Sequence, residues 1–264
     1  MPELPEMEAW RRQLDDPVSA FPIERAGPAH IATLKTFDPP LSALEGRRLA
    51  GAERRAKRLL FPTEDGELVL LVHLMSAGRL RYLQAGEKGP KTPAFRLRFQ
   101  GGGELVLTEG GPKKRAGVWL LSPEAAAAEL EHLGPEALGL GADRLGEILA
   151  EQPRRLHSLL RDQRVIAGIG RAWANEILHA AKLSPFAPAQ GLSPVQVSEL
   201  ARRSTPSSSA ASSCASVARR TRRSTASTTS CTSPASCAAR RSSASTSTST
   251  RSSTARRVRP AAGC

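Results

Sequence analysis

The C-terminal 61 residues limit the fold of this chain most strongly, because they contain no large apolar side chain. Residues 204–264 lack Leu, Ile, Met, Phe, Tyr and Trp, and they consist mostly of Ser, Thr, Ala and Arg. Such a segment cannot bury enough apolar surface to offset the entropy lost on ordering its backbone. We therefore expect residues 1–203 to build the whole core and residues 204–264 to be disordered.

The positive charge of the chain is also concentrated in this tail. The 264 residues carry a formal net charge of +13, which favours a polyanionic partner. Residues 204–264 contribute ten Arg and no acidic residue, whereas residues 1–203 hold 28 Lys and Arg against 25 Asp and Glu. The basic excess is therefore mainly a property of the tail.

The chain carries no signal for a membrane or for export. It has no run of about 18 apolar residues, which a transmembrane helix would need. Its start, MPELPE, has neither a basic segment nor an apolar segment of the kind found in signal peptides. We expect a cytoplasmic protein without a membrane partner.

Residues 1–121 predict one helix followed by antiparallel strands. Pro5 suits the first turn of a helix, and Met7, Trp10 and Leu14 then fall on one apolar face. Strand patterns follow at residues 67–74, 95–99, 104–108 and 117–121, and the glycines at 101–103 predict a hairpin turn.

Residues 122–203 predict helices instead. The sequence Ser-Pro-Glu at 122–124 is a typical helix start, and further helical patterns lie at 145–149, 156–161, 172–181 and 193–201. The fold class expected is thus α+β. An N-terminal domain (1–121) holds a helix and an antiparallel β-sandwich, a helical domain follows (122–203), and the tail (204–264) is low in complexity.

Pro2 is a candidate nucleophile, because removal of Met1 would expose its secondary amine. Attack of this amine on a sugar C1′ gives an iminium without an N–H, which stays charged and favours elimination. Glu3 and Glu6 are neighbouring carboxyls that could act as general acids. Alternatively, Pro2 and Pro5 only stiffen the entry to the helix.

Five segments resemble the formamidopyrimidine-DNA glycosylase and endonuclease VIII family. Residues 2–8 (PELPEME) resemble its PELPEVE start, and residues 73–80 (HLMSAGRL) resemble its HLGMSGxL strand end. Lys57, within residues 54–61 (RRAKRLLF), resembles its hairpin lysine. Residues 159–170 and 175–185 resemble its helix–two-turn–helix element, LLLDQ…IAGIGN and ADEIL…HP. The similarity covers residues 1 to about 203.

This resemblance implies catalytic roles for four residues. Pro2 would be the nucleophile, Glu3 the general acid and Glu6 a support for the opened sugar. Lys57 would contact the DNA near the lesion and assist proton transfer, although a solvated basic hairpin is the alternative. The activity implied is that of a bifunctional DNA glycosylase and abasic-site lyase, which excises oxidised bases and then cleaves the strand.

The resemblance also implies contacts with damaged double-stranded DNA by a monomer. His73 would meet a phosphate, Met75 would lie near the space left by a flipped base, and the turn of Gly168 and Gly170 would grip the backbone. A helical turn that merely packs in the core fits this glycine pattern equally well. The other DNA-binding candidates are Arg171, Lys113, Lys114 and Arg115.

Several positions depart from the family pattern. Arg171 replaces an asparagine, and His157 replaces a lysine. The family methionine that fills the space of the flipped base aligns with Ser76, and Met75 lies one residue before it. The Arg–Phe wedge loop is absent, and residues 108–115 (TEGGPKKR) occupy its place. The preference for oxidised purines or oxidised pyrimidines therefore stays open.

The zinc finger that ends the family is missing as well. Cys214, Cys231, Cys237 and Cys264 are spaced 17, 6 and 27 residues apart, which does not fit a CxxC–CxxC tetrathiolate site. Codons shifted by one nucleotide over residues 234–263 do permit CxxC–x16–CxxC followed by QTGGR. We interpret the tail as a frameshifted zinc finger with the slip near residues 202–204, so the chain as written should bind no zinc and should act weakly or not at all.

Two functions remain open on the sequence alone. The first is the glycosylase and lyase, and the second is a non-catalytic nucleic-acid-binding helix–two-turn–helix protein. The adjacent Pro2 and Glu3 favour the enzyme, because a binding module needs no free proline amine. A genuine Ser/Thr/Arg-rich tail that binds nucleic acid through charge is the alternative to a frameshift.

Overall fold

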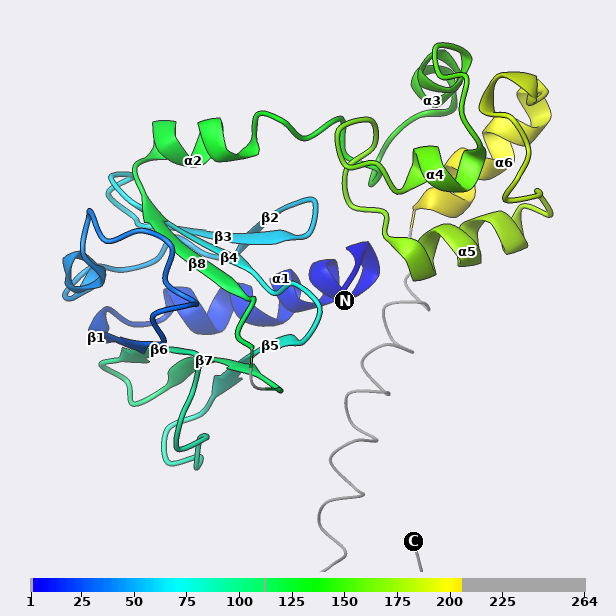
Figure 1. Ribbon diagram of the computed structural model, residues 1–264. Helices are drawn as coiled ribbons and strands as arrows, with labels where there is room; N and C mark the ends of the chain where they lie inside the picture. The colour runs from blue at the N-terminus through cyan, green and yellow to red at the C-terminus, as the bar shows by residue number, and fades with distance from the viewer. Residues whose placement is uncertain (1, 112, 206–264) are drawn as a thin grey trace, which may run out of the picture. The chain divides into compact units, whose positions relative to one another are not determined.

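The computed structural model describes residues 2–111 and 113–205 (Figure 1). Its first half contains the helix α1 (Leu4–Ser19) and a short 3-10 turn, η1 (Leu41–Leu44). The strands of this half are β1 (Ile23–Ala29), β2 (Glu53–Arg55), β3 (Arg58–Pro62), β4 (Val69–His73), β5 (Gly78–Leu83), β6 (Phe95–Phe99), β7 (Glu104–Glu109) and β8 (Gly117–Leu121).

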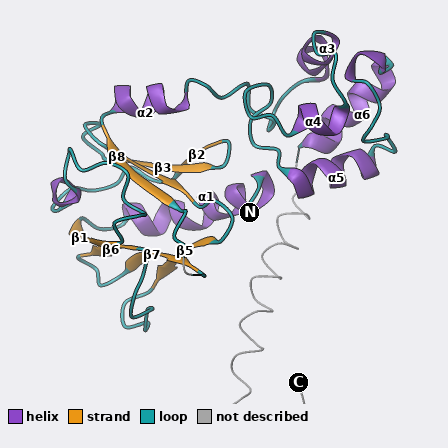
Figure 2. Ribbon diagram, in the orientation of Figure 1, coloured by secondary structure: helices purple, strands orange, loops and turns teal. Residues whose placement is uncertain are grey.

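These strands form two antiparallel sheets, with the orders β1-β6-β7-β5 and β2-β3-β4-β8 (Figure 2). The glycine turn at 101–103 joins β6 to β7 as a hairpin, in which Phe95 pairs with Leu107. The alternating pattern predicted an antiparallel sandwich, and the structure confirms it.

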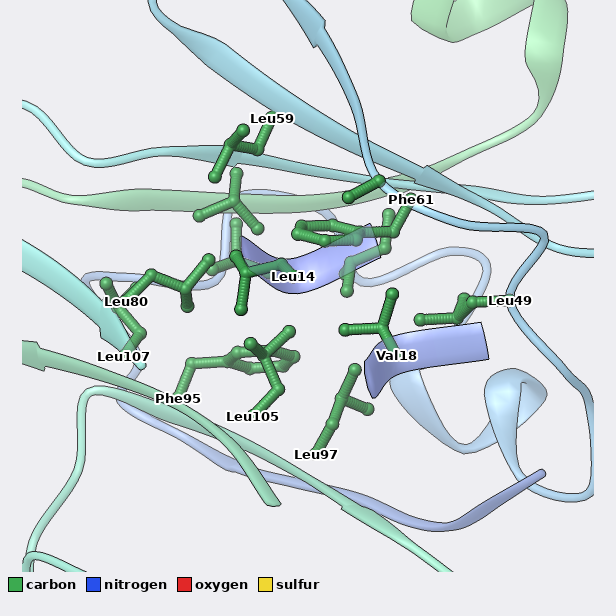
Figure 3. Packing of buried hydrophobic residues seen from close by; sticks show 14 of the residues in the cluster. Leu14, Val18, Leu49, Leu59, Phe61, Leu80, Phe95, Leu97, Leu105 and Leu107 are labelled. Carbon is green, nitrogen blue, oxygen red and sulfur yellow. The ribbon is translucent and has the colours of Figure 1, made fainter. Parts of the chain in front are cut away.

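The core of this half lies between the two sheets and includes one face of α1. Leu14 and Val18 of α1 pack among Phe61 from one sheet and Phe95 and Leu105 from the other (Figure 3). Met7 is also fully buried, and Trp10 packs against the same cluster. The apolar face expected of the N-terminal helix is confirmed.

The second half is helical, as its sequence predicted. It contains α2 (Pro123–Leu130), α3 (Ala142–Ala150), α4 (Leu156–Leu160), α5 (Arg171–Ala180), the 3-10 turn η2 (Ala189–Gly191) and α6 (Pro194–Ser204). The hydroxyls of Ser122 and Ser193 cap α2 and α6 by accepting backbone N–H bonds. A second apolar core joins α3, α4, α5 and α6, and Leu4 of α1 belongs to it. The first turn of α1 is therefore anchored in the helical core.

The described chain ends just beyond α6. This helix includes Ser204, whose Oγ donates a hydrogen bond to the carbonyl of Leu200. Residues 206–264, including all four cysteines, lie outside the described residues, so the expectation of a disordered tail lies there as well. Within the described part of the chain, no helix combines the length and the apolar character needed to cross a bilayer.

Candidate active site

The candidate nucleophile and acid lie at the N-terminus of α1. Pro2 is buried and directly precedes Glu3, the N-cap residue of this helix. The backbone N–H of Glu3 donates to Glu6 Oε2 at 2.8 Å. Glu6 therefore fixes the backbone that carries Pro2 and Glu3, by satisfying an amide that the helix leaves unpaired.

The side chain of Glu3 reaches a second helix. Its carboxylate accepts the backbone N–H of Ala172 at 3.0 Å through Oε1 and that of Trp173 at 2.8 Å through Oε2. Both amides lie in the first turn of α5, where the helix dipole favours negative charge. Glu3 is only 6 % exposed, so this carboxylate is held between two helix N-termini.

Lys57 lies near the same carboxylate, although it comes from the sheet. It occupies the turn between β2 and β3, follows Ala56 in a left-handed conformation (φ 54°), and is 7 % exposed. Burial lowers the pKa of Lys57, the charge of Glu3 opposes this change, and the charge of Arg161 adds to it. Pro2 and Glu3 are thus adjacent at the start of α1, and the charge of Glu3 acts on the buried Lys57 of the β2–β3 turn.

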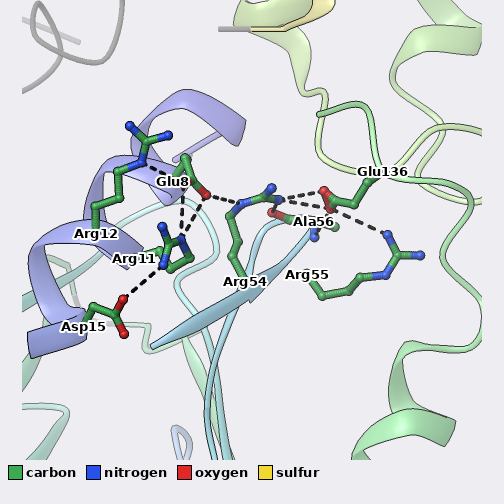
Figure 4. Close-up of polar contacts among 8 residues, drawn as sticks. All are labelled: Glu8, Arg11, Arg12, Asp15, Arg54, Arg55, Ala56 and Glu136. Atoms are coloured by element: carbon green, nitrogen blue, oxygen red, sulfur yellow. Dashed lines mark hydrogen bonds and ion pairs between the residues drawn. The ribbon is translucent and has the colours of Figure 1, made fainter. Parts of the chain in front are cut away.

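A buried ion-pair network holds this lysine turn (Figure 4). The side chain of Arg54 is 5 % exposed and bridges Glu8 of α1, at 3.2 Å, to Glu136, at 2.8 Å. Glu136 also accepts the backbone N–H of Ala56, and Arg55 donates to the carbonyl of Gly134 at 2.7 Å. The β2–β3 turn is therefore fastened to α1 and to the segment that leads into the helical domain.

His73 is the last residue of β4, and Met75 lies two residues further along the chain. Burial and the charges of Arg58 and Lys57 lower the pKa of His73 from 6.5 to about 4. His73 is therefore neutral near pH 7 and would meet a phosphate as a hydrogen-bond donor rather than as a cation. Met75 is 36 % exposed and has a φ of 51°, which is unusual for a residue with a side chain.

The side chains of the three basic residues after Pro112 differ in whether they are free to contact DNA. Lys114 Nζ donates to the carbonyls of Glu109, at 2.6 Å, and Gly111, at 3.0 Å. The side chains of Lys113 and Arg115 are exposed, while the backbone N–H of Arg115 donates to the buried carboxylate of Glu109. Glu109 thus organises the loop that presents the exposed cations.

The glycine turn before α5 is closed by Gln163. The Gln163 carboxamide donates to the carbonyl of Ile169 at 2.7 Å and accepts the N–H of Gly168 at 3.0 Å. Arg171, the first residue of α5, has an exposed side chain. The turn therefore presents Arg171 outward, while the amide of Gly168 serves the turn itself.

Sequence reasoning missed Arg54, Glu136 and Glu109. The adjacent arginines at 54–55 were a signal, because two arginines beside a turn often pair with carboxylates. The sequence could not show their partners, since Glu136 lies 82 positions from Arg54.

The described residues offer no metal site. Across 2–111 and 113–205, no group of three or more His, Cys, Asp or Glu could hold a metal ion. The cysteines of the tail lie outside this part, and their spacing does not fit a zinc tetrathiolate. The described residues therefore offer no ligand set for the zinc expected of the family, and no catalytic step is assigned to a metal.

Comparisons with known proteins agree with the sequence motifs. Residues 1–112 match the family model for the formamidopyrimidine-DNA glycosylase N-terminal domain, and residues 133–206 match that for its H2TH domain. A formamidopyrimidine-DNA glycosylase from Teredinibacter turnerae is 37 % identical over 193 residues, which cover 70 % of this chain and 69 % of that protein. One from Moorella thermoacetica is 35 % identical over 210 residues, which cover 76 % and 74 %.

Solved structures share the fold. A Lactococcus lactis Fpg in complex with abasic-site DNA matches with a TM-score of 0.68 and 23 % identity, over 77 % of this chain and 75 % of that one. The family models and the relatives, together with the N-terminal Pro2 and Glu3, show that this chain belongs to the formamidopyrimidine-DNA glycosylase family.

Proposed function

We propose that this chain is a DNA-repair glycosylase that excises oxidised bases from double-stranded DNA and cleaves the resulting abasic site as a lyase. The observation that carries the proposal is that the first turn of α5 fixes the carboxylate of Glu3 directly after Pro2. The buried Lys57 supports it, because the charge of this carboxylate acts on its pKa. The names of the relatives, and the abasic DNA bound by the Lactococcus protein, support damaged DNA as the substrate. We propose that the chain acts on it as a monomer.

The chemistry begins with the Pro2 amine, which removal of Met1 exposes. Its nitrogen forms a bond to C1′ of a nucleotide flipped from the stack, and the bond from C1′ to the base breaks. Two protons move in this step: the one that the Pro2 nitrogen loses and one that Glu3 supplies go to the leaving base and to the ring oxygen of the opening sugar. The product is an iminium that has no N–H to lose, so it draws electrons from C2′. Loss of a C2′ proton then expels the 3′ phosphate and cleaves the strand.

The surrounding residues position the DNA. Burial lowers the pKa of Lys57, which makes proton release from this group easier, and Glu6 supports the opened sugar. Neutral His73 donates to a phosphate, and the exposed side chain of Met75 fills space vacated by the flipped base. Lys113 and Arg171 offer exposed charge to the backbone, and Arg115 does the same.

Borohydride trapping on abasic-site DNA tests this proposal. A chain processed to Pro2 should form a covalent adduct, because borohydride reduces the iminium to a stable amine. No adduct would contradict the lyase and leave a non-catalytic DNA-binding protein. A Pro2→Gly variant that traps equally well would show that another amine is the nucleophile.

We also propose that residues 204–264 are read from a shifted frame of a gene that encodes a zinc finger. The match to the H2TH domain ends at residue 206, beside the composition change, and this supports the proposal. Resequencing the gene through codons 201–264 tests it, and an unbroken frame in several isolates would refute it. A frame-restored chain should bind one zinc ion through four cysteines and should excise bases faster than the chain as written.

A further inference from the structure

Glu3, the N-cap residue of α1, and Leu4, its first residue, lie against two glycines that precede α5. A methyl group on Gly170 would lie 2.3 Å from Glu3 Cδ and 2.4 and 2.6 Å from its oxygens. A methyl group on Gly168 would lie 3.2 Å from Leu4 Cδ1. The closest approach in this turn is thus between Gly170 and the carboxylate that the proposed reaction uses.

The backbone of Gly170 does not itself require glycine. Its φ of −114° and ψ of −164° are extended and open to any residue. Gly141, the N-cap of α3, offers a comparison: it is also extended, and a methyl group there would meet nothing within 4 Å. The need for glycine at position 170 therefore comes from the carboxylate of Glu3 and not from backbone conformation.

Three amides of this turn and of the first turn of α5 have partners within the chain. Ala172 and Trp173 donate to Glu3, and Gly168 donates to Gln163. A phosphate that took these amides would have to displace the carboxylate or open the turn. These three amides therefore hold Glu3 and the turn itself.

We propose that Gly170 is a positioning residue for Glu3. Its missing side chain leaves the space in which the Glu3 carboxylate meets the first-turn amides of α5, and this fixes the acid beside Pro2. The effect of this role on catalysis rests on the proposed function, in which Glu3 is the general acid. The contact itself can be measured without any activity.

The test uses the chain labelled with 15N-tryptophan, in which three tryptophans give three backbone amide signals. Glu3→Gln should shift the amide proton of Trp173, because it replaces a charged acceptor 2.8 Å away by a neutral one. In the Gly170→Ala background the same substitution should leave the Trp173 signal unchanged. An equal shift in both backgrounds would overturn the proposal. Gly141→Ala is the matched control and should leave the shift intact.

A folding control keeps the test decisive. Should Gly170→Ala fail to fold, Glu3→Ala/Gly170→Ala should fold, since the clashing carboxylate is gone. A double variant that still fails to fold would overturn the proposal, because the glycine would then be needed for another reason.

Two activity measurements separate positioning from phosphate binding. Gly170→Ala should slow base excision by about 100-fold, because a positioned general acid usually accelerates a reaction by at least about that factor. Its Kd for a duplex with a tetrahydrofuran abasic analogue should change by less than about twofold, since no charge that meets DNA is removed. A weakened Kd with a retained Trp173 shift would overturn the proposal. If the frame-restored chain excises no base, the proposed function fails, whereas the shift measurement still decides the role of Gly170.

Discussion

Replacement of Glu136 by glutamine should destabilise the protein, because Glu136 binds three groups of the β2–β3 turn with one carboxylate. It pairs with Arg54 at 2.8 Å, accepts the N–H of Ala56, and lies 3.6 Å from Arg55 (Figure 4). Glutamine keeps the size of the side chain and one acceptor oxygen, but it removes the charge. Arg54, at 5 % exposure, then keeps a single counter-ion, Glu8.

The size of the effect follows from the burial of the pair. Removal of one partner from a fully buried ion pair costs about 3–5 kcal/mol. Glu136 is 23 % exposed and Arg54 keeps its contact with Glu8, so about half of that cost applies, or about 2 kcal/mol. For a folded region of this size, 1 kcal/mol shifts Tm by about 2–4 °C, so Tm should fall by about 4–8 °C.

Thermal unfolding followed by circular dichroism measures this change. Glu147→Gln is the control, because Glu147 pairs with Arg144 on an exposed helix face, where both side chains are more than half exposed. That variant should lose less than about 0.5 kcal/mol. Equal losses in the two variants would refute the reasoning, since burial would then not decide the strength of the pair.

Three further predictions concern the site. His73 has a folded pKa of about 4 against an ordinary 6.5, so unfolding takes up a proton between these values. Stability should therefore fall by up to about 3 kcal/mol as the pH drops through this window, and His73→Gln should flatten that part of a denaturation series. Arg161→Gln should raise the pKa of Lys57 by removing a nearby positive charge, which would move the alkaline limb of the excision profile to higher pH. Gln163→Glu should loosen the turn before α5, because a carboxylate oxygen would replace the amide that donates to Ile169; faster hydrogen exchange at Gly168 would show this, and unchanged exchange would contradict it.

The sequence predicted those elements whose local pattern is strong, whereas β1, β2, β3 and β5 were not placed. Alternation placed β6 and β7, apolar spacing placed the buried face of α1, and serine–proline starts placed α2 and α6. These signals come from neighbouring residues, whose side chains point to the same face of a strand or helix. The motif resemblance then supplied the order of the domains.

Contacts between distant segments could not be predicted in this way. Glu3 was expected near the chemistry, but its partners Ala172 and Trp173 lie about 170 positions away and bind through their backbone. Every residue other than proline has a backbone N–H, so the residue type does not show which amide will donate to a side chain. The same holds for the Ala56 amide, which Glu136 accepts.

Because of these distant contacts, the geometry of the site and the affinity for DNA depend on different parts of the chain. The carboxylate of Glu3 is fixed by α5, the turn of Lys57 by Glu136, and Leu4 by the helical core, so every support lies within residues 2–205. Substitutions at these supports should therefore act on the chemical step and on stability. Changes in residues 204–264, where ten arginines stand without an acid, should act on the salt-dependent affinity for DNA. Measuring both quantities for each variant distinguishes an enzyme with a damaged site from one with an intact site that holds its substrate poorly.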